Sequence, residues 1–94
     1  MFPFFYLRMN YYVYILKSLK DGKYYIGSSA NVEARIDYHN SGRQRSTKHR
    51  IPFILIFQEE FNSKSAAEKR ERLIKSFKGG NAFKKLIEGC GPAE

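Results

Sequence analysis

The sequence contains a single cysteine, Cys90, so it can form no internal disulfide, and it has no Cys/His spacing typical of a zinc site. It also lacks any apolar run long enough to span a bilayer. Its apolar start, MFPFFYLRM, contains Pro3 and has neither a basic leader nor a small-residue cleavage site, which argues against a signal peptide. These absences favour a protein of the reducing cytoplasm.

No repeat, linker or low-complexity tract divides the chain. Because 94 residues leave no room for a second core, residues 10–94 are predicted to form one compact domain, with residues 1–9 as an extension before it. A weak membrane-surface anchor is the alternative interpretation of that extension.

Acidic residues are scarce: the chain has 9 Asp and Glu against 17 Lys and Arg, for a formal net charge of +8. Such a charge says nothing about fold, but it predicts a polyanionic partner, and nucleic acid is the commonest one. A merely basic protein and an anionic membrane surface are the alternatives.

Two short segments rich in β-branched and aromatic residues, 11–18 and 23–27, are predicted to form a β-hairpin. Asp21 and Gly22 between them suit a two-residue type I′ turn, which needs positive φ at both central positions. The sequence therefore predicts two antiparallel strands joined by a tight turn.

The length of that turn fixes which residues are opposite each other. Counting outward predicts that Tyr14 lies opposite Ser29 and Leu16 opposite Gly27. Because side chains alternate along strands, Tyr14 and Tyr25 share one face, and a one-residue slip would separate them. The other face is predicted to carry Val13, Ile15 and Tyr24.

The next segment, SSANVEARIDYHNSG, predicts a helix capped by Asn31 and stopped at Gly42. Four of its residues fall at positions i, i+3, i+4 and i+7 and form one stripe, which should face the core. Two members of that stripe are ionisable. The stripe consists of Val32, Arg35, Ile36 and His39.

The most apolar run, residues 51–61, is predicted to be the central strand of the sheet. Ser65 and Glu68 match a capping box and predict the start of a second long helix, which a Gly-Gly pair ends before a short helix over 81–88. The order β-β-α-β-α-α predicts an α+β fold, in which helices flank a small three-stranded antiparallel sheet.

The second long helix carries a carboxylate on its apolar face, because Ala67, Glu71 and Ile74 are spaced as i, i+4 and i+7. A pair with Lys75 at i+4 is the alternative explanation of Glu71. Glu68 is a neighbouring candidate, but the predicted capping box already accounts for it.

The loop after the first helix contains RQRSTKHR and no acid. It predicts contacts to the nucleic-acid backbone that depend strongly on salt and weakly on sequence, with a solvated charge run as the alternative. No aromatic residue interrupts this loop, so base stacking is not indicated there. The predicted contact residues are Arg43, Arg45, Lys48, His49 and Arg50.

The ordered set of motifs resembles the GIY-YIG nuclease domain. YVY is followed about ten residues later by YIG, whose tyrosine is Tyr25. Arg35 follows ten positions after Tyr25, and a glutamate lies further along within KRERLIK. HNSG strengthens the resemblance, which covers residues 11–75. It is closest to small, free-standing bacterial members, which are similar to the nuclease modules of the excision-repair endonuclease and of certain homing endonucleases. Tyr12 stands at the position where the family's GIY motif has its glycine.

The resemblance implies a metal-dependent endonuclease that hydrolyses phosphodiester bonds in DNA, with RNA as an alternative and with a link to DNA repair. Tyr14 and Tyr25 would be the active-site phenols, one of them the general base for the attacking water or its positioner. Arg35 would hold the scissile phosphate, and His39 would assist proton transfer or orient the nucleophile.

The resemblance also implies that Glu71 binds one divalent cation, Mg²⁺ or Mn²⁺, and that Gly27 lets the backbone pass close to the site. A guanidinium suits phosphate because its planar fork matches two oxygens, and one carboxylate suits Mg²⁺, which keeps several waters. An ordinary tyrosine, with a pKa near 10, is ionised only about once in a thousand at pH 7. Either a nearby cation (Arg35, Lys17 or Lys23) favours phenolate, or the phenol stays neutral and passes a proton through His39.

Two rival interpretations remain beside the nuclease. One is a nucleic-acid-binding module that keeps the fold without turnover. The other is a structural or interaction protein whose basic face meets an acidic partner. In a chain this small, substrate selectivity would come from substrate shape or from a partner protein.

Overall fold

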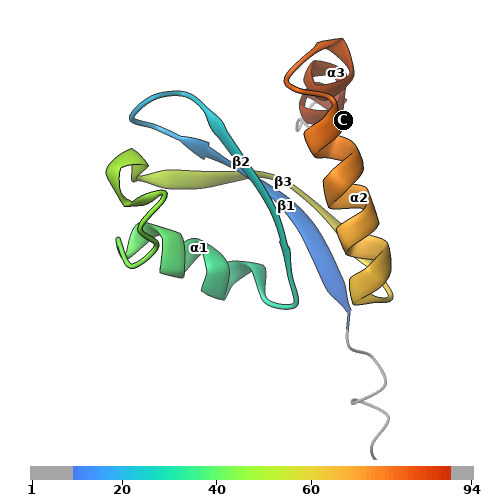
Figure 1. Cartoon of the computed structure of the whole chain (residues 1–94), viewed down its shortest axis with the longest axis horizontal. Helices are drawn as coiled ribbons and strands as arrows, with labels where there is room; N and C mark the ends of the chain where they lie inside the picture. Colours follow the sequence, from blue (N-terminus) through green and yellow to red (C-terminus); the bar gives the residue numbers. More distant parts are fainter. Residues whose placement is uncertain (1–9, 90–94) are drawn as a thin grey trace, which may run out of the picture.

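The computed structural model describes residues 10–89, so the predicted extension over 1–9 and Cys90 lie outside the described residues. Figure 1 shows helices on either side of the sheet. None of the helices in the described part of the chain is long and apolar enough to cross a membrane. The elements are β1 (Tyr11–Ser18), β2 (Tyr24–Ser29), α1 (Val32–Asn40), the 3-10 turn η2 (Lys48–Arg50), β3 (Phe53–Phe61), α2 (Lys64–Ser76) and α3 (Asn81–Gly89).

The sheet is antiparallel with strand order β2-β1-β3, which confirms the predicted α+β fold and its element order. The prediction that residues 51–61 form the central strand is wrong, because β1 pairs with both other strands and β3 lies at an edge. Ile54 and Leu55 of β3 are 43% and 38% exposed, as an edge strand allows. The apolar run reflects burial at a few positions rather than a central place in the sheet.

The predicted hairpin register is also wrong, by two residues. Tyr14 pairs with Gly27 instead of Ser29, and Leu16 pairs with Tyr25. The connection has four residues between Ser18 and Lys23 instead of two, because the Ser18 N–H donates to the Lys23 carbonyl at 2.8 Å. Since a shift of two residues preserves the alternation of side chains, the predicted faces are correct.

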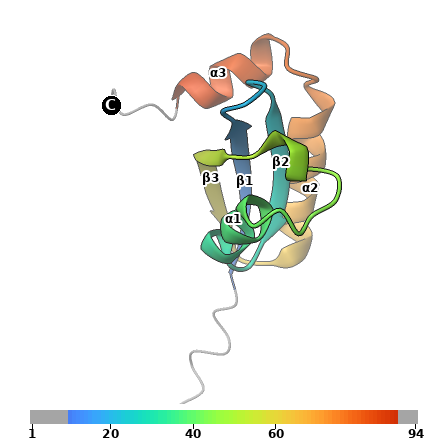
Figure 2. The same cartoon turned by 90° about the vertical axis from the view of Figure 1, so that its left-hand side faces the viewer.

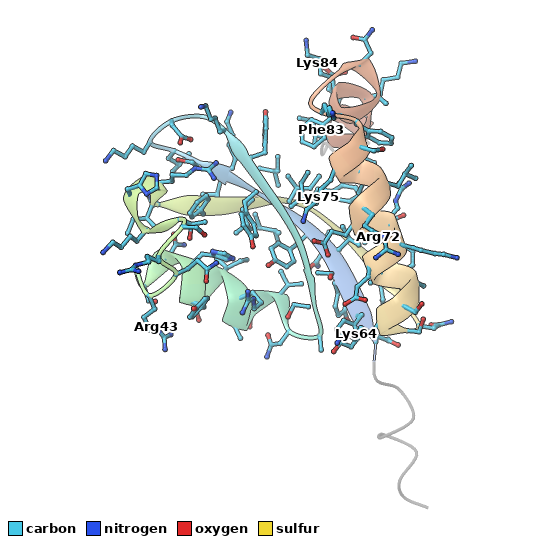
Figure 3. All side chains as sticks on the ribbon, viewed as in Figure 1. Arg43, Lys64, Arg72, Lys75, Phe83 and Lys84 are labelled. Carbon is cyan, nitrogen blue, oxygen red and sulfur yellow. The ribbon has the colours of Figure 1, made fainter. Side chains whose placement is uncertain are left out.

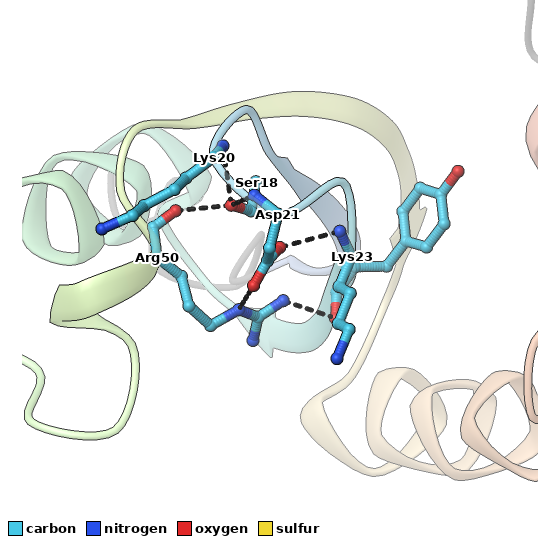
Figure 4. Close-up of polar contacts among 6 residues, drawn as sticks. Ser18, Lys20, Asp21, Lys23 and Arg50 are labelled. Atoms are coloured by element: carbon cyan, nitrogen blue, oxygen red, sulfur yellow. Dashed lines mark hydrogen bonds and ion pairs between the residues drawn. The ribbon is translucent and has the colours of Figure 1, made fainter.

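Polar contacts of Ser18 and Asp21 explain the longer turn. The Ser18 hydroxyl oxygen accepts from the backbone N–H groups of Lys20 and Asp21, each at 3.1 Å. The Asp21 carboxylate accepts from the Lys23 N–H at 2.8 Å, and Gly22 adopts a φ of 73° (Figure 4). Side-chain oxygens thus satisfy the donors that a two-residue turn would have paired across the strands.

The two faces of the sheet carry separate apolar clusters. Val13 and Ile15 pack with Ala67 and Ile74 of α2 and with Phe83 of α3. On the opposite face the cluster lies under α1, and Figure 2 shows α1 in front of the sheet and α2 behind it. That cluster consists of Tyr14, Leu16, Val32 and Phe53, with Tyr12, Tyr25, Ile36 and Ile51 packed against it.

The helix starts were predicted with unequal success. Asn31 caps α1 as predicted, since its side-chain oxygen accepts from the Ala34 N–H at 3.0 Å. The predicted capping box is wrong: Ser63 caps α2 by accepting from the Ala66 N–H at 3.1 Å, and Ser65 lies inside the helix. Glu68 is therefore left without the role that had explained it.

Candidate functional site

Tyr14 and Tyr25 lie on the face of the sheet that α1 covers. Their ring centroids are 6.4 Å apart and their planes differ by 23°. Tyr14 comes from the central strand and is 1% exposed, whereas Tyr25 comes from the edge strand β2 and is half-buried. The alternation of residues along both strands brings the two phenols together, as the sequence predicts.

Gly27 makes room for the Tyr14 phenol. Tyr14 and Gly27 are paired across the two strands, and the phenol lies over the glycine. A β-carbon at position 27 would lie 2.5 Å from Tyr14 Oη and 2.7 Å from Cζ, which is shorter than any normal carbon contact. The close approach at this glycine is thus made by the chain's own tyrosine.

Arg35 and His39 reach the same face from α1. The Arg35 guanidinium is near enough to the Tyr14 phenol to affect its pKa, and it lies 5.0 Å from the centroid of the Tyr38 ring. His39 is fully buried, and its ring centroid lies 4.5 Å from that of Tyr25. The ionisable half of the α1 stripe therefore faces the two phenols.

Burial raises the pKa of Tyr14 above its ordinary value of 10.0. The charges of Tyr25 and Glu71 act in the same direction, while the interaction with Arg35 lowers the pKa but does not outweigh burial. The same interaction raises the pKa of Arg35, so the guanidinium stays charged. The Tyr14 phenol is consequently protonated at neutral pH.

We expect this shift to appear in an alkaline titration. Because the pKa of folded Tyr14 lies above the unfolded value, its contribution to stability is complete below about pH 10 and is lost as the pH rises through the folded pKa. Tyr14→Phe should remove that part of the alkaline decline in the free energy of unfolding. In an ultraviolet titration, the phenol missing from the variant should be one that ionises above pH 10; a missing phenol that ionises lower contradicts the assignment.

Burial also lowers the pKa of His39, and the positive charge of Arg35 lowers it further. The imidazole is therefore neutral near pH 7. Its Nδ1 atom lies 3.1 Å from the Thr47 hydroxyl oxygen, and within residues 10–89 its buried Nε2 atom has no hydrogen-bond partner. Thr47 was not predicted as a site residue, because no local pattern indicates a contact between a helix and the loop after it.

Glu71 approaches from the other layer of the molecule. Its Oε1 atom accepts a hydrogen bond from the Ser28 hydroxyl at 2.7 Å, and its Oε2 atom lies 2.8 Å from Lys75 Nζ. The side chain of Ser28 points away from the face that carries Tyr25, because the two residues have opposite parity on β2. The carboxylate thus reaches the edge strand beside Gly27, and its charge contributes to the pKa of Tyr14.

The chemistry of Glu71 fits a single divalent cation. Its side chain is 18% exposed, and a carboxylate with access to water suits Mg²⁺, which keeps several waters and takes phosphate oxygens as further ligands. Within the described residues, no three His, Cys, Asp or Glu side chains gather to hold a metal. Lys75 occupies one carboxylate oxygen, so a metal on that oxygen would take the place of the ammonium group.

In the basic loop, residues 43–50, the five predicted contact residues comprise one anchored arginine and four exposed side chains. Arg50 donates through Nε to Asp21 Oδ2 at 3.0 Å and through Nη2 to the Tyr24 carbonyl at 3.4 Å, which ties the loop to the hairpin turn (Figure 4). Its guanidinium also lies 5.5 Å from the centroid of the Phe53 ring. The exposed members of the predicted set are Arg43, Arg45, Lys48 and His49.

Basic side chains lie on both sides of the sheet. Figure 3 shows Arg43 near the end of α1, while Lys75 lies on α2, on the other side of the sheet. Arg43 stacks on Tyr38, with its guanidinium carbon 5.2 Å from the ring centroid. The Tyr38 ring therefore has one arginine from α1 and another from the loop beside it. The sequence analysis did not predict Tyr38 as a site residue.

Known proteins resemble this chain over most of its length. The sequence profile of the GIY-YIG catalytic domain matches residues 10–84. The chain is 47% identical over 80 residues to a UPF0213 protein of Staphylococcus haemolyticus, covering 84% of this chain and 96% of that one. It is 44% identical over 81 residues to a UPF0213 protein of Staphylococcus saprophyticus, covering 85% and 98%. The solution NMR structure of a UPF0213 protein of Bacillus halodurans superposes with a TM-score of 0.52 at 37% identity and covers 89% of both chains.

Proposed function

Because the chain belongs to the GIY-YIG domain family, whose members are generally endonucleases, we propose that it is a divalent-metal-dependent endonuclease acting on DNA. The observation that carries the proposal is the convergence of a guanidinium, two phenols and a neutral imidazole on one face, beside a carboxylate at the edge of the same sheet. We also propose that residues 10–94 act as one domain and that the protein works in the cytoplasm.

In the proposed reaction, Arg35 binds the scissile phosphate, because its charge is permanent and its fork matches two phosphate oxygens. Glu71 would hold the metal ion, which as a Lewis acid would stabilise negative charge on the phosphate and the leaving oxygen. Arg35 interacts with Tyr14, so the bound phosphate would lie near that phenol. Tyr14, being protonated at neutral pH, would position the attacking water and not act as a preformed phenolate.

The proton of the attacking water would leave towards the neighbouring Tyr25 and His39, whose ring centroids lie 4.5 Å apart. An imidazole that is already neutral has a nitrogen free to accept a proton. The water oxygen bonds to phosphorus, one ester bond of the phosphate breaks, and the departing oxygen takes a proton from solvent. Tyr14 could act either as a phenolate or as a neutral phenol, and its raised pKa supports the neutral form.

The experiment that tests this function is a nicking assay on supercoiled plasmid and on branched oligonucleotides, with Mg²⁺, with Mn²⁺ and with a chelator. We expect metal-dependent nicks with wild-type protein and none after chelation. Salt-dependent binding without any metal-dependent product would support the binding module instead. Absence of affinity for both DNA and RNA would leave only a protein partner for the basic face.

We further propose that the exposed part of the basic loop contacts the nucleic-acid backbone. Arg45→Gln should weaken binding and reduce the slope of log K against log salt by about 1, because one phosphate contact is lost. Lys69→Gln is the matched control, since it removes one exposed positive charge from α2 without touching the loop. Fluorescence anisotropy from 50 to 200 mM salt measures both. Equal slopes for the two variants would show that the loop acts only through net charge.

A further inference from the structure

Thr47 is buried in the middle of a basic, exposed loop. It is 2% exposed, while its neighbours Ser46 and Lys48 are exposed. Its backbone is satisfied within the loop, because its N–H donates to the Gln44 carbonyl at 3.1 Å and its carbonyl accepts from the Arg50 N–H at 2.8 Å. Its side chain is therefore free to point inward, where its hydroxyl oxygen lies 3.1 Å from His39 Nδ1.

The surroundings of the His39 ring are otherwise almost entirely aromatic. The centroid of the His39 ring lies 4.5 Å from that of Tyr25 and 5.9 Å from those of Tyr38 and Phe53. Among residues 10–89, the Thr47 hydroxyl is the one hydrogen-bonding group that reaches an imidazole nitrogen. The orientation of the ring therefore depends on aromatic packing and on this single polar contact.

We propose that Thr47 is a positioning residue, whose hydroxyl oxygen accepts the Nδ1 proton of His39 and so keeps Nε2 unprotonated as the proton acceptor of the site. The proposal rests on the proposed function, in which His39 receives the proton of the attacking water. It also gives the basic loop a second part in the reaction, because the segment expected to contact phosphate would hold the imidazole as well.

Two physical arguments bear on the protonation of His39: the first selects the tautomer, and the second keeps the ring neutral. A buried N–H without a partner is rarer and costlier than a buried acceptor without one, so the unpartnered Nε2 is better left as a lone pair. The positive charge of Arg35 acts on His39 and disfavours additional protons on the ring. A threonine hydroxyl can either donate or accept, and the unpartnered nitrogen decides which it does here.

The test compares Thr47→Val, which keeps the shape but removes the hydroxyl, with Thr47→Ser, which keeps the hydroxyl. Nitrogen-15 NMR of labelled imidazoles distinguishes protonated from unprotonated ring nitrogens in the free protein. We expect a single Nδ1–H tautomer for His39 in wild type and in Thr47→Ser, and a mixture in Thr47→Val. We expect kcat to fall by at least about tenfold in Thr47→Val with KM little changed, and to recover in Thr47→Ser.

The two readouts separate this proposal from the proposed function. An Nε2–H tautomer in wild type, or an unchanged tautomer in folded Thr47→Val, overturns the role of Thr47 whether or not the protein cuts DNA. Equal losses of kcat in the valine and serine variants also overturn it, because they would reflect packing and not the hydroxyl. If wild type shows no cleavage, the proposed function fails, and the NMR comparison still decides which nitrogen Thr47 holds. Circular dichroism and thermal unfolding establish that each variant is folded.

Discussion

Glu71→Gln should lose metal-dependent nicking by about 10²–10³-fold, because the lost metal interaction is worth several kcal/mol and each tenfold in rate corresponds to about 1.4 kcal/mol. The amide keeps the size of the side chain, and its oxygen can still accept from Ser28. The lost pair with Lys75 is a partly exposed i,i+4 contact and costs about 0.5 kcal/mol at most. We therefore expect a folded variant that still binds DNA.

Glu68→Gln is the matched control for that variant. Glu68 is half-buried on the same helix, three residues earlier, and the real cap at Ser63 leaves it without a capping role. We expect its nicking rate to stay within about threefold of wild type, the size of an ordinary surface-charge effect. Rates measured across a Mg²⁺ series, with binding followed in parallel, compare the two carboxylates. A loss in Glu68→Gln equal to that in Glu71→Gln would contradict the assignment of Glu71 as the metal-binding carboxylate.

Gly27→Ala should destabilise the fold and displace the Tyr14 phenol. A β-carbon 2.5 Å from Tyr14 Oη forces the ring or the edge strand to move, and overpacking of this kind costs about 1–3 kcal/mol. For a domain of this size each kcal/mol lowers Tm by roughly 4–8 °C. Because the phenol interacts with Arg35, we also expect nicking to fall by more than the loss of folded protein explains.

A double-mutant cycle with Tyr14 identifies the source of that loss. Tyr14→Phe should relieve only part of the clash, because the ring carbon Cζ is still 2.7 Å from the added methyl group. Tyr14→Leu, whose side chain ends before this point, should make the alanine at position 27 much less costly. Thermal unfolding of the four proteins in each cycle measures the coupling free energy. Additive effects at positions 14 and 27 would place the cause elsewhere.

Much of the geometry could be predicted from period-2 and period-3.6 patterns. Alternation along the hairpin placed both phenols on one face, and the spacing along α1 placed Arg35 and His39 opposite them. These features depend only on parity or helical phase, so an error of two residues in register left them intact. The register itself depends on turn length, which the Ser18 side chain lengthens by satisfying two backbone donors.

Contacts between distant segments could not be predicted in this way. Ser28 and Glu71 are 43 positions apart and meet only because α2 packs across the sheet. Thr47 is buried within RQRSTKHR, whose composition indicates a solvated loop. The edge position of β3 was missed for the same reason, since an apolar run reports burial but not which neighbours a strand has.

The acid and the phenols come from opposite layers, and this has a consequence for the protein while it is being made. The hairpin and α1 are synthesised first, so a growing chain holds both phenols, the arginine and the imidazole before residue 71 exists. Such an unfinished polypeptide would carry most of the proposed machinery and yet have no carboxylate for the metal. Synthesis order alone would keep a ribosome-bound fragment from cutting nucleic acid.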